Sequence, residues 1–454
     1  MFGLSEGCIR DLSRAALVDT IAGEPHPAGE KAAEGLRLFS VLLKKFDVKL
    51  VPVSRPGCPV YFCTGILWKQ ASPSSCRGAQ RQSFPGGGQG TNAIDAALGC
   101  LGELSERLSL CSMGEDDPRV SDFSSGLAGF DLRELLGFSV MQADKISQKK
   151  QTTEAIKTGT DAALNVPTKR QISITNRSSG VTVQIPSYLV LFDEFHLGSG
   201  VYSGSASSVG CAVWVDHVGA RERAYLELVE RDSVAQAWYN RLGIKLVRRE
   251  DLSNFLPKKM IDHLDNSVRH WVVLSVATDL DAHVMIALSY NEGGKWTAFG
   301  SSAGWSAGDA INSAIEEMLQ AENSLLMMDA AYPVSDTDAV SRSRVPSQLC
   351  YARSHSIIED LRLTDIAHES KKELDKTYSY EGLLDIINEK RLRIWEFDAT
   401  RPDIKVPCIK LLSPDLCTWE PRFGKARLFD GVVERGLRSH PASEAEFAAR
   451  PFPF

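Results

Sequence analysis

The feature that most constrains this chain is a pattern that occurs three times: a Gly- and Ser-rich stretch followed by a helical run. Each helical run carries a small residue, then Glu three positions on, then Glu or Gln after three more. The copies are Cys100, Glu103 and Glu106; Ala224, Glu227 and Glu230; and Ala314, Glu317 and Gln320. Residues at i and i+3 lie on one side of a helix, so each copy presents two oxygen-bearing side chains together.

These paired side chains are suited to a divalent cation and a nucleotide. Two carboxylates on one exposed helix face cost roughly 0.3 kcal/mol, and a bound cation offsets that cost. Mg²⁺ prefers carboxylate and phosphate oxygens, and glycine-rich loops before helix N-termini let backbone N–H groups approach phosphates. Arg107 and Arg231 directly follow two of the pairs and could neutralise phosphate charge. The pattern predicts a metal-dependent nucleotide site, and pattern alone leaves open a solvated helix face.

Composition argues against several other classes of protein. The chain has 454 residues and a formal net charge of −7, which is unlike a general binder of nucleic acid or of anionic membranes. No apolar run approaches the ~20 residues of a membrane span, and residues 1–19 lack the apolar core of a signal peptide. We therefore expect a cytoplasmic protein that binds neither nucleic acid nor membrane.

The ten cysteines include no Cys-x-x-Cys pair, and a chain of this length needs no disulfides for stability. We expect reduced thiols, several of them buried. Cys58, Cys63 and Cys76 could in principle hold zinc, but their spacing matches no familiar zinc finger and no fourth ligand is evident.

The order of the predicted elements favours an α+β fold, because strands and helices are mixed without the regular βαβ rhythm of a doubly wound sheet. Helices are predicted over 29–45, 91–110, 218–240 and 309–325. Strands are predicted over 48–53, 271–289 (a hairpin), 393–397 and 405–412.

Glycine, serine and polar clusters predict the loops. These loops cover 71–90, 143–180, 198–210 and 299–308. We divide the chain into an N-terminal region of helix and strand, residues 1–74, and a larger domain, residues 75–454.

Five ordered segments of the larger domain resemble the YcaO family. The first three contain the repeated pattern: GQGTNAIDAALGCLGELSERLSL, then SVGCA running on to LELVERD, then AGDAINSAIEEMLQ. The fourth is WEFDATRPDIKVPCIKLLSPDL, and the last comprises RLFDGVVERG and the closing RPFPF. The resemblance runs from about residue 75 to residue 454.

The resemblance implies a YcaO-type fold in which three carboxylate-bearing helices hold ATP and magnesium. The metal-side residues it implies are Glu103, Glu106, Glu227, Glu230, Glu317 and Gln320. The nucleotide-binding residues it implies are Gly88, Gly90, Arg107, Ser208 and Arg231.

The implied reaction is ATP-dependent cyclodehydration. In the azoline-forming branch, a Cys, Ser or Thr side chain of a ribosomally made peptide attacks the preceding carbonyl, and the amide oxygen leaves as phosphate. Members of that branch commonly end in a proline-rich tail that reaches the active site, and this sequence ends in Pro451, Phe452, Pro453 and Phe454. Prolines favour a stiff extended segment, so we expect the carboxylate of Phe454 to act as general base. A frayed terminus is the alternative.

Some positions depart from the family pattern. Gln89 stands where members often carry Lys, Trp214 and Val215 where they carry Gly and Asn, and Ser313 where Arg is common. These departures imply altered ATP contacts or a site completed by a partner. Trp419, outside the pattern, is interpreted as a core or interface anchor.

The resemblance also implies partners. A precursor peptide is the expected substrate, with a separate ThiF-like, leader-recognition subunit, a flavin-dependent azoline dehydrogenase in many pathways, and a homodimer within a larger complex. Two other functions stay open: thioamide or macroamidine formation, whose enzymes usually lack the proline-rich tail, and a non-catalytic scaffold.

Overall fold

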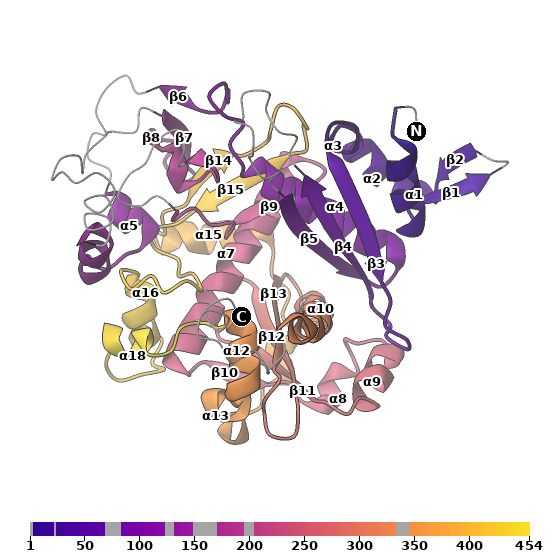
Figure 1. Cartoon of the computed structure of the whole chain (residues 1–454). Helices are drawn as coiled ribbons and strands as arrows, with labels where there is room; N and C mark the ends of the chain where they lie inside the picture. Colours follow the sequence, from indigo (N-terminus) through magenta and orange to yellow (C-terminus); the bar gives the residue numbers. More distant parts are fainter. Residues whose placement is uncertain are drawn as a thin grey trace.

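The computed structural model describes the chain except for residues 1–2, 22–23, 69–82, 123–130, 149–169, 195–203 and 333–344. The described residues form helices and antiparallel sheets, which confirms the predicted α+β class. A small two-stranded sheet of β1 (Val18–Ile21) and β2 (Glu24–Pro27) projects from one side (Figure 1). No helix in the described part of the chain combines the length and apolarity needed to cross a bilayer.

The first of three larger sheets contains β3 (Asp47–Val53), β4 (Tyr61–Trp68) and β5 (Ser83–Gly90). Helix α4 (Ala93–Ser109) packs on β5 and β4 and shares a hydrophobic core with the N-terminal helices. The division predicted at residues 74 and 75 falls outside the described residues, and strands from both sides of it belong to this one sheet.

The second sheet has the order β10-β11-β12-β13 and consists of β10 (Ile244–Leu246), β11 (His270–Val276), β12 (His283–Tyr290) and β13 (Ala298–Gly304). Helix α10 (Ala307–Ala331) packs on β13 and β12. The hairpin predicted over 271–289 is therefore confirmed as β11 and β12.

The third sheet has the order β6-β7-β14-β15-β9, with β8 paired to β7. Its strands are β6 (Ser121–Asp122), β7 (Arg170–Asn176), β8 (Thr182–Pro186), β9 (Cys211–Val213), β14 (Trp395–Asp398) and β15 (Cys408–Leu412). The predicted strands near the C-terminal end are thus present. The loop predicted over 143–180 is wrong for residues 170–176, which pair with β14 as β7.

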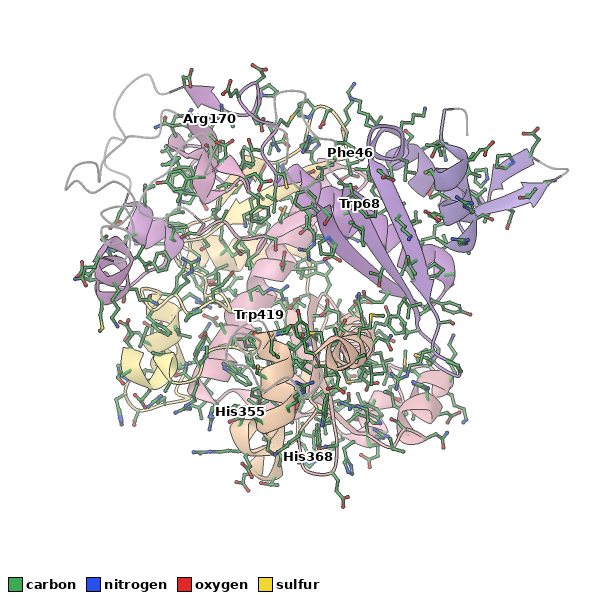
Figure 2. The ribbon with its side chains drawn as sticks, viewed as in Figure 1. Phe46, Trp68, Arg170, His355, His368 and Trp419 are labelled. Carbon is green, nitrogen blue, oxygen red and sulfur yellow. The ribbon has the colours of Figure 1, made fainter. Side chains whose placement is uncertain are left out.

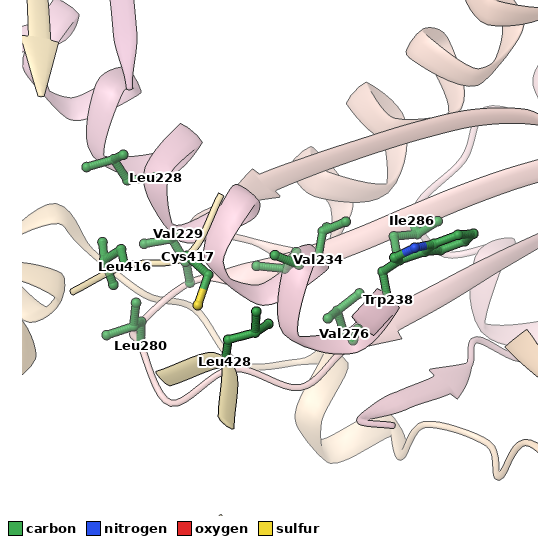
Figure 3. Close-up of a cluster of buried hydrophobic side chains, with 14 of the residues drawn as sticks. Leu228, Val229, Val234, Trp238, Val276, Leu280, Ile286, Leu416, Cys417 and Leu428 are labelled. Atoms are coloured by element: carbon green, nitrogen blue, oxygen red, sulfur yellow. The ribbon is translucent and has the colours of Figure 1, made fainter. Parts of the chain in front are cut away.

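Helix α7 (His217–Asn240) joins the second and third sheets, because it packs against β15, β9, β13 and β12. Its second half is buried nearly all round. Figure 3 shows Trp238 of this helix beside Ile286 of the second sheet, and Val229 beside Leu416 and Cys417, all within one hydrophobic core cluster.

Shorter elements surround these sheets. In the N-terminal half they are α1 (Glu6–Arg14), α2 (Glu30–Leu38), α3 (Ser40–Lys45), α5 (Leu132–Leu136) and η1 (Ser187–Leu189). In the C-terminal half they are α8 (Arg249–Leu252), α9 (Lys258–Asp265), α12 (Ser347–Ser354), α13 (Ile357–Leu361), η3 (Leu363–Asp365), α14 (Lys371–Leu374), α15 (Tyr380–Glu389), α16 (Ala426–Phe429), α17 (Gly431–Glu434) and α18 (Glu444–Ala448). The single helix predicted over 29–45 is interrupted at Phe39.

Two of the glycine-rich stretches predicted as loops are strands: β5 within 71–90 and β13 within 299–308. Their glycines allow a helix to lie directly on the strand. A Cβ atom on Gly88 would sit 2.1 Å from the carbonyl oxygen of Ala96 in α4, and one on Gly300 would sit 2.2 Å from that of Ala314 in α10. The glycines of these two stretches therefore mark places where a helix packs directly on a strand, and do not mark loops.

Some sequence predictions fall outside the described residues. They are the zinc candidate Cys76, most of the segment 143–180, and the first part of the loop 198–210.

Candidate functional site

The first glutamate of each repeated pattern occupies the same position on its helix. In each helix the N-cap side chain accepts a hydrogen bond from the N–H group three residues on, and the glutamate follows the N-cap by eleven residues. The pairs are Asn92 and Glu103 in α4, Asp216 and Glu227 in α7, and Ser306 and Glu317 in α10. The resemblance between the three copies is therefore one of three-dimensional structure as well as of sequence.

Each of these glutamates is held by a backbone N–H group that lies earlier in the chain. The donors and distances are Gly87 to Glu103 at 2.6 Å, Gly210 to Glu227 at 3.1 Å, and Ser301 to Glu317 at 3.2 Å. Hydrogen bonds from N–H groups to a carboxylate are charge-assisted and fix its orientation. One carboxylate oxygen of each glutamate is thereby directed toward its neighbouring strand or loop.

Arginines pair with two of the three glutamates. Arg107 donates from Nε to Glu103 at 3.0 Å, and Arg231 donates from Nη2 to Glu227 at 3.1 Å. The equivalent position on α10 is Ala321. Among the three helices, α4 and α7 therefore each supply an arginine to their own glutamate, and α10 has alanine at that position.

The second residues of the patterns bring α7 and α10 close to each other. Ser301 donates its hydroxyl to Glu230 at 2.6 Å while its N–H group binds Glu317, so one serine links the two helices. Arg231 also contacts Glu230. Gln320 lies beside β5, because a Cβ atom on Gly87 would be 2.3 Å from its amide nitrogen.

Burial and mutual repulsion favour the protonated form of several of these carboxylates. Burial, and next the charge of Glu230, raises the pKa of Glu317 to about 8. Burial also raises the pKa of Glu230, and burial with the nearby Cys211 and Glu227 raises that of Glu106 well above its ordinary value. A divalent cation would relieve the repulsion between these groups.

In the described part of the chain, no three His, Cys, Asp or Glu side chains already surround a metal-sized position. Mg²⁺ does not need such a preformed set, because it usually binds one or two carboxylates together with substrate phosphates and waters. The concentration of buried carboxylates beside an open cavity therefore fits magnesium delivered with a nucleotide.

That cavity has a volume of about 640 Å³ and lies between α4 and α10, within the range of small-molecule sites. Its lining includes Glu103, Arg107, Glu317 and Gln320, together with Gly87, Gly88, Gln89, Gly99, Phe299, Ala321, Ser324, Gln348 and Trp419. The predicted nucleotide residues Gly90, Ser208 and Arg231 are not among the lining residues. Gly90 lies against Asp95 at the start of α4, and Ser208 belongs to the turn before β9.

Lys410 is a residue near the site that the sequence interpretation missed. Its side chain is buried, and its amine donates to the carbonyls of Ser207, at 2.8 Å, and Val209. Burial lowers its pKa. Lys410 therefore holds the turn that presents the Gly210 N–H group to Glu227.

Trp419 is a second missed residue, since it was interpreted as a core or interface anchor. Its ring lines the cavity and lies under the guanidinium of Arg231, at 3.6 Å from ring centroid to guanidinium carbon. Figure 2 labels Trp419 near the centre of the molecule. Neither local spacing nor periodicity marks this tryptophan, because its cavity position depends on contacts with α7.

The C-terminal residues lie against the aromatic wall of the cavity. The ring of Phe454 stacks on Phe299 with centroids 4.8 Å apart, and Phe452 lies 4.6 Å from Trp419. The hydroxyl of Ser347 donates to the carbonyl of Pro453 at 3.3 Å. Figure 1 shows this end of the chain at the centre of the molecule, beside α12.

Comparison with known proteins identifies relatives of the chain. The family described as YcaO cyclodehydratase, ATP- and Mg²⁺-binding, matches residues 87–417. A search of curated protein sequences finds no match.

Similar folds occur in solved structures. A heterocyclase in complex with substrate and cofactor is 20% identical, with a TM-score of 0.71 over 96% of this chain and 58% of that one. The heterocyclase TruD is 23% identical, with a TM-score of 0.60 over 80% of this chain and 52% of that one. The chain thus spans little more than half the length of these two heterocyclases. YcaO from Methanopyrus kandleri, bound with AMPPCP and Mg²⁺, is 13% identical, with a TM-score of 0.57 over 92% and 97% of the two chains.

Proposed function

The chain belongs to the YcaO family, and on that premise we propose that it uses ATP and Mg²⁺ to convert Cys, Ser or Thr residues of a ribosomally made peptide into azoline rings. The observation that carries this proposal is the threefold arrangement of Glu103, Glu227 and Glu317. Each glutamate sits at the same point of its helix and is oriented by a backbone N–H group, and two of the three, Glu103 and Glu317, line the cavity of about 640 Å³.

Within this proposal, Glu103, Glu317 and Gln320 line the cavity and present oxygen atoms to magnesium, with Glu106, Glu227 and Glu230 behind them. Bound ATP supplies the phosphoryl group that turns the amide oxygen into a good leaving group. Arg107 and Arg231 offset the negative charge of the phosphates from two sides. Gly88 contributes β5 backbone to the cavity lining, while the absence of its side chain lets α4 lie directly against the strand.

In this proposal the tail residues Pro451, Pro453 and Phe454 act on the substrate peptide and do not bind ATP or magnesium. Phe452 and Phe454 pack against Trp419 and Phe299, so the tail reaches the edge of the cavity. In this position a tail carboxylate would act as general base on the attacking side chain, as we expect for Phe454.

We also propose the partners that family membership suggests. A precursor peptide would be recognised with the help of a ThiF-like, leader-recognition subunit, and a flavin-dependent dehydrogenase would oxidise azolines to azoles where the pathway requires it. A homodimer within such a complex, in the cytoplasm, is part of the same proposal.

The test is reconstitution of the reaction. The purified chain is incubated with its candidate partner, a Cys/Ser/Thr-rich precursor peptide and MgATP, and the peptide mass is followed. The proposal expects the loss of one water mass per ring, dependent on ATP. Replacement of oxygen by sulfur in the peptide would instead indicate thioamide formation, and absence of ATP turnover with every partner would identify a scaffold.

A further inference from the structure

A second cavity, of about 210 Å³, lies away from the carboxylate site, where the C-terminal end of α7 meets α18. It is lined by four arginines, Arg241, Arg362, Arg438 and Arg450, with Tyr239, Asn240, Leu242, Glu446 and Phe447. None of these residues lines the larger cavity. The four guanidinium groups come from separate parts of the sequence, so the fold brings them together.

The charges around this cavity are only partly compensated. Arg241 pairs with Asp360 at 2.8 Å, but Asp360 also accepts a hydrogen bond from the hydroxyl of Tyr351 at 2.7 Å. Arg438 lies 3.4 Å from Glu446, whose carboxylate also accepts the Ser443 N–H group at 2.6 Å. Two carboxylates therefore face four guanidinium groups.

The remaining cations, Arg362 and Arg450, form no ion pair with any residue that the structure describes. Burial, and next the positive charge of Arg241, lowers the pKa of Arg450. The cavity thus holds cations that repel one another, and a bound anion would remove that repulsion.

A third cavity, lined by Lys390, Arg391, Arg393 and Arg427 among others, shows that basic side chains gathered at a cavity can be largely neutralised by ion pairs. Three of its four cations are neutralised within the protein: Arg393 pairs with Asp415, Lys390 pairs with Asp279, and Arg427 pairs with Asp279 and Asp232. The fourth, Arg391, forms no ion pair with a described residue. The four-arginine cavity leaves two of its four cations without an ion pair, so its surplus of positive charge is larger.

Helix ends explain part of the arrangement. Arg241 and Arg362 are C-cap residues of α7 and α13 with φ of 55° and 53°. A cation at a helix C-terminus is stabilised by about 0.3–1 kcal/mol. That effect accounts for single arginines at these ends, but it does not account for the convergence of four on one cavity.

We propose that this four-arginine cavity binds a small, multiply charged oxyanion of the phosphate class. Guanidinium groups form paired hydrogen bonds with such anions, and four of them provide more donors than the two carboxylates use. The site is linked to the tail, because the carbonyl of Arg450 accepts a hydrogen bond from the indole of Trp238 at 3.2 Å and the tail begins at the next residue. Anion binding would therefore fix the start of the tail.

The test is titration of the full chain with inorganic phosphate, at constant ionic strength, by calorimetry. Arg107→Gln distinguishes phosphate binding at the four-arginine cavity from binding at the larger cavity, because Arg107 lines only the larger one. We expect phosphate to bind the four-arginine cavity of this variant with unchanged affinity. The double variant Arg362→Gln and Arg450→Gln should bind phosphate at least about tenfold more weakly, because charge-assisted hydrogen bonds are lost.

Arg391→Gln is the matched control, because Arg391 is also exposed and also has a positive φ. Its phosphate affinity should equal that of the wild type, and all variants should unfold at the wild-type temperature. The proposal fails if the double variant binds phosphate like the wild type, if Arg107→Gln alone removes all binding, or if the wild type binds no phosphate at millimolar concentration.

Discussion

The guanidinium carbon of Arg231 lies 3.6 Å from the centroid of the Trp419 indole ring, which lines the open cavity, and the same guanidinium contacts the buried Glu230. Arg231 also pairs with Glu227, which makes it the link between the α7 carboxylates and the cavity wall. A cation on an aromatic face gains about 0.5–2 kcal/mol, depending on how far it is desolvated.

Replacing Trp419 with Ala should release Arg231 and lower the rate of peptide modification by about tenfold, a loss equal to roughly 1.4 kcal/mol of this interaction. Trp419→Phe should retain most of the rate, because it keeps an aromatic face. Rates with saturating MgATP and peptide provide the measurement. Equal rates for Trp419→Ala and the wild type would show that the stacking has no role in the reaction.

The raised pKa of Glu317 makes stability depend on pH. Because the folded-state pKa is about 8 and the ordinary value is 4.5, the folded protein binds more protons than the unfolded chain between these values. The free energy of unfolding of the metal-free protein should therefore decrease as pH rises from about 4.5 to 8 and then level off. Urea unfolding at a series of pH values tests this, and Glu317→Gln should flatten the decrease. A variant with an unchanged pH dependence would rule out Glu317 as its source.

The contact between β5 and α4 predicts opposite effects for two glycine substitutions. Gly88→Ala places a methyl group 2.1 Å from the carbonyl oxygen of Ala96, so we expect a loss of about 2 kcal/mol or more in the free energy of unfolding. Gly102→Ala is the matched control on α4: its Cβ meets nothing within 4 Å, and it should stabilise the helix by about 0.5–1 kcal/mol. Chemical denaturation measures both. Similar values for the two variants would mean that the strand and helix are not in close contact.

The tail prediction separates ring formation from nucleotide binding. Removal of residues 451–454 should abolish ring formation while leaving ATP affinity within about twofold, because the carboxylate side chains of the metal site come from other segments. Phe454→Ala, which removes the stacking on Phe299 but keeps the chain length, should reduce the rate by a smaller factor. An unaffected rate in the shortened protein would refute a role for the tail.

Local sequence patterns predicted much of this structure. Helical periodicity and the repeated spacing of Glu and Gln were sufficient to locate α4, α7 and α10 and the carboxylate face of each. Strand alternation located β11 and β12 in the same way. These signals lie within one element, so they can be read without knowledge of the fold.

Other features could not be predicted because they depend on contacts between distant segments. Gly88 and its neighbours were predicted from the sequence to form a loop, whereas they form a strand on which α4 lies. Lys410 and Trp419 join the site from a part of the chain about 200 residues after α7 begins, through burial and stacking that no local spacing encodes. The four-arginine cavity likewise has no sequence signature.

The most direct test of the account is the magnesium-dependent affinity for ATP in single variants of the three equivalent glutamates. Glu103→Gln, Glu227→Gln and Glu317→Gln keep size and hydrogen-bonding capacity but remove one charge each. Titration calorimetry should show ATP binding at least about tenfold weaker in each of the three, with the magnesium dependence reduced.

Glu316→Gln is the control, because Glu316 lies one residue from Glu317 on α10 but outside the repeated pattern of the three helices. Its ATP affinity should match that of the wild type. If ATP binds the three glutamate variants as tightly as it binds Glu316→Gln, the three-helix site is not where this protein holds magnesium and nucleotide.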